Sequence, residues 1–342
     1  MLRDCTWRKL QSLIWRRAGS CDVNNLGQLI NLLIEVMLPL TLLVAAGAFW
    51  PLFFPDAPVA ALRTQLNRLV LNLFYPSILF AIAATTPITT DLLSVPLLVG
   101  VGALLSGAVL YPLLYHSALG RGLKDSTRAI LLVGGMSGNT FNIGVPVLTF
   151  LYGPDAPRYA VFNDMLMTLP VLWSLGVWIS TRLGTDDPNV PHASVWRAIF
   201  SMPPIWAFIL GTAAQQLGWA YPPLVNATRM IGLATIPVIL FVLGMSIPWG
   251  RLTPRREILA VAAVKLLGTP LLVWLAAKLL FQPMGEAQYA AVVEGTTPTM
   301  VAALVLTDRF HLDHSAAALL IGWSTIFFWI TLPLFVVLGL IR

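Results

Sequence analysis

The sequence predicts an all-α polytopic membrane protein with ten transmembrane helices, arranged as two inverted repeats of five helices. Apolar residues make up 57% of the 342 residues and charged residues only 11%, whereas a soluble domain has about 25% charged residues. The apolar residues gather in stretches of the length that crosses a bilayer, about 20 residues. Features of the first half of the chain also recur in the same order in the second half.

Ten apolar stretches follow one another with short connections. Their approximate ranges are 28–53, 66–85, 92–115, 127–152, 158–180, 200–218, 224–247, 257–281, 287–307 and 315–341. No soluble domain fits between them, so the chain is expected to form one integral membrane unit. The expected division is an N-terminal tail (1–27), a first five-helix repeat (28–180), a polar linker (181–199) and a second five-helix repeat (200–342).

The Lys and Arg residues of the connections predict the orientation, because cytoplasmic connections carry an excess of both. Those after odd-numbered spans are Arg63, Arg68, Arg121, Lys124, Arg128, Arg182, Arg197, Arg251, Arg255, Arg256 and Arg309. Those after even-numbered spans, with the C-terminus, are Arg158, Arg229 and Arg342. We therefore expect a multi-pass protein of the cell membrane, with the linker in the cytoplasm and both termini outside it.

The N-terminal tail conflicts with this orientation, because it carries Arg3, Lys9, Arg16 and Arg17. It has no apolar run that could serve as a signal peptide. Two interpretations stay open: the tail lies outside despite its charge, or translation starts near Val23.

An internal repeat links the two halves. Residues 67–80, "NRLVLNLFYPSILF", align without gaps with residues 228–241, "TRMIGLATIPVILF". At nearly the same offset, "GNT" at 138–140 aligns with "GTT" at 295–297. Because each half holds an odd number of spans, the second half enters the membrane from the opposite side. Inverted repeats of this kind build many secondary transporters.

The fourth and ninth expected spans contain residues that interrupt a helix. Residues 137–147 read "SGNTFNIGVPV", and residues 294–300 read "EGTTPTM". Glycine tolerates unwound backbone, proline removes a backbone donor, and Asn and Thr side chains can bond freed backbone groups or a ligand. Half-helix N-termini at such breaks can hold an anion. Paired breaks in the two halves indicate a binding site near the bilayer midplane.

We therefore expect substrate to bind between the two broken spans. The candidate substrate-binding residues on these spans are Asn139, Thr140, Asn142, Gly144, Pro146, Glu294, Thr297 and Pro298. Lys265, deep in the eighth span, is a further candidate, because charged groups inside spans are rare and usually functional. It either binds the substrate anion or pairs with Glu294. Asp164, on the fifth span, is placed to bond the open backbone of the fourth.

These motifs resemble the auxin efflux carrier family of membrane transporters. "NTFNIGVP" at 139–146 is similar to the family's fourth-span signature, and 202–211, 234–247, 298–313 and 321–341 are similar to further family patterns. The resemblance covers about residues 28–342. It implies ten helices in two inverted repeats, with spans four and nine crossing at their prolines. It also implies a scaffold of spans 1, 2, 6 and 7 and a mobile bundle of spans 3–5 and 8–10.

Family substrates are organic anions, which implies an auxin-like molecule or a mono- or dicarboxylate such as malate or malonate. By motif, Asn139, Pro146 and Pro298 would line the site, whereas Asn142 and Glu294 depart from the family pattern. The expected function is secondary transport by elevator-like alternating access, with no enzymatic activity. The expected partners are the small organic anion and the lipid bilayer, with a homodimer left open.

Two functions from other classes compete with transport. "GMSG" at 135–138 matches the G-x-S-G of intramembrane serine proteases, with Ser137 as the nucleophile. Such enzymes need a histidine inside the membrane to activate the serine, and the four histidines of this chain fall in or beside loops. A membrane sensor that transports nothing is the other alternative, and a flux assay separates it from a carrier.

We expect neither a metal site nor a cofactor. Cys5 and Cys21 have no metal-ligand spacing, and the histidines do not cluster. The basic residues are scattered over many connections and form no single patch, which predicts no nucleic-acid partner.

Overall fold

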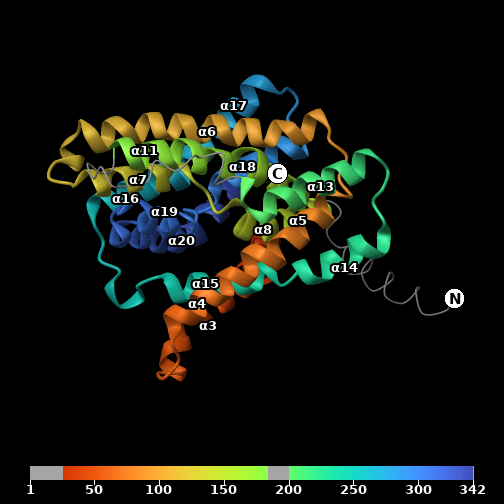
Figure 1. Ribbon diagram of the computed structural model, residues 1–342. Coiled ribbons are helices and arrows are strands. Elements are labelled where there is room, and N and C mark those ends of the chain that lie inside the picture. Colours follow the sequence, from red (N-terminus) through yellow and green to blue (C-terminus); the bar gives the residue numbers. More distant parts are fainter. Residues whose placement is uncertain (1–25, 184–199, 342) are drawn as a thin grey trace.

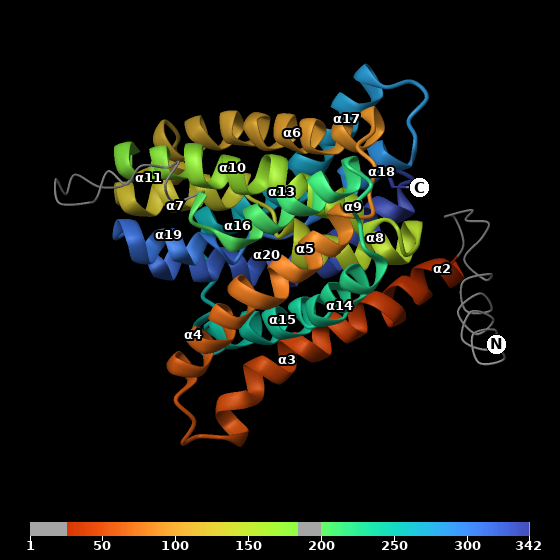
Figure 2. The ribbon, with the colours of Figure 1, turned by 45° about the vertical axis from the view of Figure 1, so that its right-hand side comes forward.

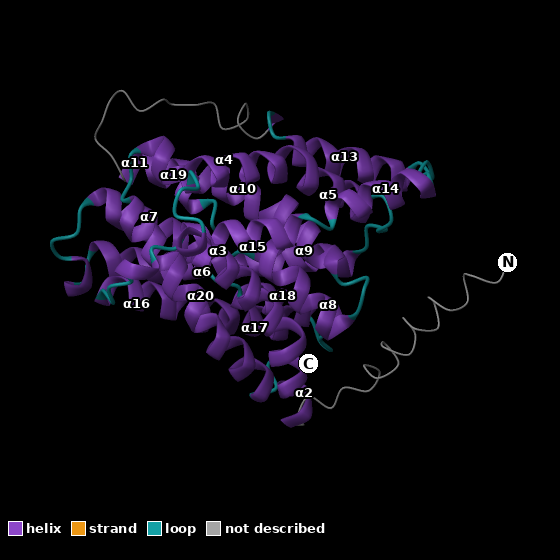
Figure 3. Cartoon of the chain, turned by 90° about the horizontal axis from the view of Figure 1, so that it is seen from below, coloured by secondary structure: helices purple, strands orange, loops and turns teal. Residues whose placement is uncertain are grey.

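The computed structural model describes residues 26–183 and 200–341. Within these ranges the chain is helical and forms no strand, as expected for the fold class (Figures 1 and 3). Most of the N-terminal tail, with Cys5, Cys21 and Val23, and most of the linker lie outside the described residues.

The helices follow one another along the chain with short connections. They are α2 (Leu26–Asn31), α3 (Leu38–Phe53), α4 (Val59–Leu69), α5 (Tyr75–Ala83), α6 (Thr90–Tyr115), α7 (Asp125–Met136), α8 (Val145–Tyr152), α9 (Pro157–Asn163), α10 (Leu169–Val171), α11 (Val177–Leu183), α13 (Pro203–Gln216), α14 (Pro222–Gly232), α15 (Thr235–Ser246), α16 (Arg256–Ala263), α17 (Thr269–Leu280), α18 (Glu286–Thr296), α19 (Ala303–Phe310) and α20 (His314–Val337).

Seven continuous helical stretches of the described chain are long and apolar enough to cross a membrane. They are Leu32–Phe53, Val59–Ala83, Thr90–Tyr115, Pro157–Leu183, Pro222–Arg251, Arg256–Leu280 and His314–Val337. The other three expected spans consist of shorter helices: α7 and α8, α13, and α18 and α19. The protein is therefore a multi-pass membrane protein by helix length and composition, and the count of ten spans stays a prediction.

Proline accompanies most of the π-helical turns that widen the long helices. These turns cover Leu32–Met37, Val70–Phe74, Thr140–Gly144, Asp164–Thr168 and Val264–Gly268, and each ends two residues before a proline. Proline has no backbone N–H, and its ring crowds the preceding turn. A local π turn is one of the adjustments by which a helix in lipid accommodates proline. A sixth turn, Leu172–Gly176, precedes no proline.

The second span begins earlier than the hydropathy predicts. Its helix starts with α4 at Val59, whereas the apolar stretch starts near residue 66. Residues 59–69 are amphipathic, and such a helix can extend beyond the hydrocarbon while its arginines reach the interface. Arg63 and Arg68 therefore lie on α4, and the prediction that they lie in a connection is wrong.

The helices pack as two groups. In the first group, α3 lies against α15, and α5 lies against α13 and α14. In the second group, α6 runs along α17 and α18, and α16 packs against α20 (Figure 2). These contacts agree with the division into spans 1, 2, 6 and 7 and spans 3–5 and 8–10 that the family resemblance implies.

The two groups differ in how much of their apolar helix surface is buried. Only 33% of the apolar window in Leu32–Phe53 is buried, against 72% in Pro157–Leu183. At the contact between α3 and α15, a methyl group on Gly47 would meet the Phe241 carbonyl, and one on Gly244 would meet the Val44 carbonyl. Small residues let helices approach this closely in lipid. The first group therefore combines tight internal contacts with a large lipid-facing surface.

Candidate functional site

The two interruptions predicted from the sequence are present. Helix α7 ends at Met136, residues 137–139 leave the helix, and the chain turns helical again at Thr140. Helix α18 ends at Thr296, and α19 begins at Ala303. In both places an extended backbone conformation follows the helix end, at Ser137 and at Thr297.

The two breaks cross and pair with each other through their backbones. Gly138 lies opposite Thr299 in a single antiparallel bridge. The Asn139 N–H donates to the Pro298 carbonyl at 2.7 Å, and the Met300 N–H donates to the Ser137 carbonyl at 3.2 Å. Each unpaired backbone group in hydrocarbon costs several kcal/mol. The crossing therefore lets each break satisfy groups that the other leaves open.

The position of the crossing differs from the expectation in one half. Pro298 lies at the crossing, but Pro146 lies within α8, two residues after the π turn Thr140–Gly144. Pro146 therefore belongs with the other prolines that follow a π turn by two residues. Gly138 takes its place at the crossing, because a β-carbon there would lie 2.5 Å from the Thr297 hydroxyl and 3.2 Å from Lys265 Nζ.

Hydroxyl groups satisfy further backbone groups around the second break. The Thr299 hydroxyl donates to the Gly134 carbonyl at 3.1 Å, and the Thr299 N–H donates to Ser324 Oγ at 3.1 Å. The Thr297 hydroxyl donates to the Glu294 carbonyl at 2.7 Å. Thr297 thus caps its own helix, and its hydroxyl serves the backbone of the break.

A small cavity lies beside the crossing. Its lining includes the predicted residues Thr140, Lys265 and Glu294, together with Ser137 and Gly138. Its volume of about 10 Å³ suits about one water molecule. In the conformation described, this space is therefore too small for an organic anion.

The other predicted site residues lie around the crossing without lining this cavity. Asn142 Nδ2 donates to Asn139 Oδ1 at 2.8 Å, so the two amides bond each other. Gly144 lies against the Glu294 carboxyl group, which occupies the place of a β-carbon. Pro146 is half-buried on α8.

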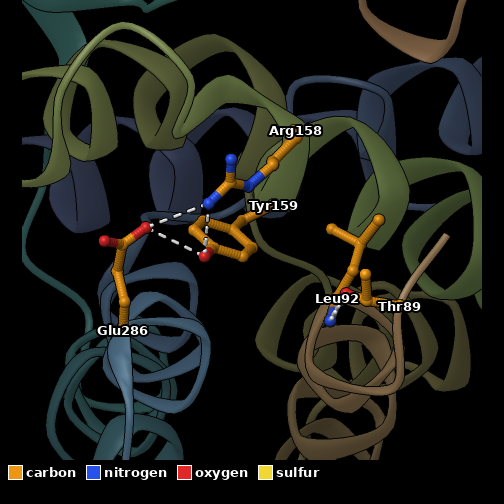
Figure 4. A network of polar contacts seen from close by, with 5 residues as sticks. All are labelled: Thr89, Leu92, Arg158, Tyr159 and Glu286. Atoms are coloured by element: carbon orange, nitrogen blue, oxygen red, sulfur yellow. Dashed lines mark hydrogen bonds and ion pairs between the residues drawn. The ribbon is translucent and has the colours of Figure 1, made fainter. Parts of the chain in front are cut away.

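The buried charges at the crossing do not form the expected ion pair. Lys265 Nζ donates to the Gly295 carbonyl at 3.4 Å and not to the Glu294 side chain. Among the described residues, ion pairs join Arg128 to Asp125 and Arg158 to Glu286. Figure 4 shows the second pair together with the Tyr159 hydroxyl, which donates to Glu286 at 2.9 Å. The ion pairs therefore lie at helix ends, and Lys265 is left to bond an open backbone carbonyl of the second break.

Asp164 contacts side chains and not the open backbone of the first break. Its carboxylate accepts from the Thr140 hydroxyl at 3.0 Å and from the Tyr75 hydroxyl. The Tyr75 ring packs edge-on against Phe141, with ring centroids 4.6 Å apart. Tyr75 belongs to α5, so this network joins the first helix group to the crossing.

A second, larger cavity of about 450 Å³ lies between the two helix groups. The first group lines it with residues that include Thr86, Arg229 and Thr235, and the second group lines it with residues that include Phe141 and Arg158. Small-molecule sites typically measure about 300–1,000 Å³. Phe141 also packs on Tyr75, so this aromatic pair connects the lining of the larger cavity with the network around Asp164.

Known proteins are similar to this chain over most of its length. The family model described as membrane transport protein matches residues 32–336, which include both breaks. An uncharacterized transporter of Methanothermobacter thermautotrophicus is 28% identical over 277 residues, covering 79% of this chain and 87% of the relative. An uncharacterized transporter of Methanocaldococcus jannaschii is 24% identical over 320 residues, covering 89% and 96%. This chain belongs to the membrane transport protein family, the auxin efflux carrier family that its motifs resemble, and is a membrane transporter.

Proposed function

We propose that this transporter moves a small organic anion across the cell membrane, either an auxin-like molecule or a mono- or dicarboxylate such as malate or malonate. The observation that carries this proposal is Lys265, a cation only 2% exposed, which lines the cavity at the crossing. An ammonium group has three donors, and the one hydrogen bond of Lys265 is 3.4 Å long. It can therefore donate to a carboxylate when the cavity opens.

We propose an elevator-like mechanism, in which the second helix group carries the crossing past the first. The larger cavity lies between the groups and is lined in part by Phe141. The small cavity lies beside the crossing. Movement at the contact of Tyr75 with Phe141 and Asp164 would join them. This contact consists of one aromatic pair and one hydrogen bond.

The proposal includes ten spans in two inverted repeats. In such a repeat the first span corresponds to the sixth, and the second to the seventh. A contact between the first and seventh spans then requires one between the sixth and second. The contacts of α3 with α15 and of α13 with α5 are such a pair, which supports the repeat.

No observation favours the protease alternative. Ser137 is buried beside the cavity. His116, His311 and His314, the histidines within the described ranges, are exposed at helix ends. None of these three can activate Ser137 in this conformation.

The test is uptake of labelled malonate, malate and indole acetate by the purified protein in proteoliposomes. Lys265→Met should lower uptake of the transported anion by about 10- to 100-fold, the range that corresponds to the loss of a hydrogen bond with a charged group. Lys278→Met is the matched control, because Lys278 lies on the same expected span but is exposed over the Trp274 ring. Uptake should persist in this control. Full uptake by Lys265→Met, or no uptake of any organic anion by the native protein, would contradict the proposal.

A further inference from the structure

Glu294 and Asn163 form an incomplete buried pair next to the crossing. Both are 0% exposed, and Asn163 Nδ2 donates to Glu294 Oε2 at 3.4 Å. The other oxygen of each side chain, Glu294 Oε1 and Asn163 Oδ1, has no hydrogen-bond partner. Buried polar atoms in native proteins nearly always have one. Two acceptors on one bonded pair of side chains therefore lack a donor.

One added proton on Glu294 would give both of these oxygen atoms a hydrogen-bond partner. A protonated carboxyl group has one O–H donor and keeps an acceptor oxygen, and an amide has an N–H donor and a carbonyl acceptor. With a proton on Oε1, Glu294 can donate to Asn163 Oδ1 while it accepts from Asn163 Nδ2. The two side chains then form a closed acid–amide pair.

Asp164 provides an internal comparison. It is also buried, at 1% exposure, but each of its oxygens already has a hydroxyl donor, from Thr140 and from Tyr75. As a carboxylate it is satisfied by its neighbours, and Glu294 is not. Of the two buried carboxyl groups, Glu294 is therefore the one whose hydrogen bonding is completed by a proton.

The charges around Glu294 favour the same assignment. Among the described residues, Asp164 and Lys265 are the charged groups whose electrostatic effect reaches it. Other ionisable side chains on the elements packed against α18 lie towards helix ends: Asp91, Tyr111, Tyr115, Tyr152, Arg158, Tyr159, Lys278 and His314. Two carboxylates and one ammonium leave one net negative charge in a buried place, which is costly. A proton on Glu294 brings the set to neutrality.

We propose that Glu294 binds a proton that it shares with Asn163, and that this proton crosses the membrane with the organic anion. This inference rests on the proposed function. Glu294 lines the same cavity as Lys265, so its negative charge repels an anion bound there. Protonation removes this repulsion, and an anion beside Glu294 favours protonation by the same amount, because linkage is reciprocal. Glu294 takes up a proton on one side and releases it on the other, one for each anion.

The first test compares accumulation with exchange in proteoliposomes. A pH gradient that is acid on the uptake side should drive accumulation of the anion by the native protein. Glu294→Gln keeps a side chain that can pair with Asn163 but cannot release a proton. It should keep measurable exchange of labelled for unlabelled anion and lose accumulation driven by the gradient.

Glu286→Gln is the matched control, because Glu286 lies on the same helix and its side chain is 46% exposed. It should accumulate anion as the native protein does. Gradient-driven accumulation by Glu294→Gln at the native level would overturn the inference. Uptake by the native protein that ignores the pH gradient would do the same, while the proposed function would stand.

The second test needs no transport. Infrared spectra of the purified protein should show the C=O band of a buried protonated carboxyl group. The band should vanish in Glu294→Gln, shift in Asn163→Leu and persist in Glu286→Gln. Absence of such a band across the pH range, or its loss in Asp164→Asn with persistence in Glu294→Gln, would contradict the assignment. If the native protein transports no anion but the band behaves as stated, the proposed function fails and the proton site stands.

Discussion

The first broken helix and the second contribute similar backbone geometry but different side chains to the crossing. The first supplies Gly138 and the bonded amides of Asn139 and Asn142. The second supplies threonine hydroxyls that bond backbone carbonyls, and it carries Glu294. Lys265 comes from a helix that packs beside the second break. The first break is therefore built for close approach, and the charged chemistry belongs to the second.

The largest expected effect concerns the buried charge of Lys265 beside the second break. Lys265→Met should lower anion uptake by about 10- to 100-fold, the range that corresponds to a hydrogen bond with a charged group. Adding Glu294→Gln should not restore uptake, because the structure has no ion pair between Lys265 and Glu294. Uptake is measured in proteoliposomes at equal protein density. Recovery in the double variant would show that the two side chains pair during transport.

Close packing at the crossing should give the next largest effect. Gly138→Ala and Gly144→Ala should each lower the free energy of unfolding by about 1–3 kcal/mol, the usual cost of an inserted methyl group. The new methyl group meets Thr297 and Lys265 in the first variant and the Glu294 carboxyl group in the second. Unfolding in mixed micelles measures the loss.

The second of these clashes can be relieved selectively. Glu294→Ala should restore part of the stability lost in Gly144→Ala and none of that lost in Gly138→Ala. Gly250→Ala is the control and should be close to neutral, because nothing lies within 4 Å of its added β-carbon. Equal effects of Glu294→Ala in the two glycine variants would show that Glu294 does not pack on Gly144.

The amides of the first break should give a smaller effect. A double-mutant cycle of Asn139→Ala and Asn142→Ala should give a coupling energy of about 0.5–1.5 kcal/mol, as expected for one hydrogen bond. The control cycle combines Asn142→Ala with Asn72→Ala, since Asn72 bonds the Arg68 carbonyl of its own helix. That cycle should be additive. Additivity in both would mean that the Asn139–Asn142 bond contributes nothing to stability.

Orientation can be tested with substitutions that change no buried contact. If the halves are inverted, the connections before α7 and before α18 lie on opposite sides of the membrane. Lys124→Cys and Arg255→Cys should be labelled only from the cytoplasm, and Gln282→Cys only from outside. The Lys124 and Gln282 positions are both exposed. Labelling of Lys124→Cys and Gln282→Cys from the same side of the membrane would contradict the inverted repeat.

Sequence patterns predict the breaks well because the cause is local. Clustered glycine, proline, asparagine and threonine weaken a helix wherever it packs, so residues 137–147 and 294–300 mark both interruptions. The site depends on how helices rotate against one another, and local patterns do not contain that information. Lys265 and Glu294 therefore share a cavity without pairing, and Pro146 lies at the start of α8 and not at the crossing.

Two side chains of the site escape prediction from the sequence for the same reason. Tyr75 reaches Asp164 from another helix group, and Asn163 reaches Glu294 across a helix contact. The one signal for Asn163 is its position next to Asp164 in an apolar span, where two neighbouring polar residues are unusual. Tyr75 precedes a proline in the repeat region and carries no comparable signal.

The central claim is that the transported anion binds at the crossing, and the variant Ser137→Cys tests it most directly. Ser137 lines the small cavity, and replacing Cys5 and Cys21 by serine leaves the introduced thiol as the single thiol in the chain. The transported anion should slow the reaction of this thiol with a thiol reagent, and Lys265→Met should remove this protection. A reaction rate that is the same with and without the transported anion would show that the anion does not bind at the crossing.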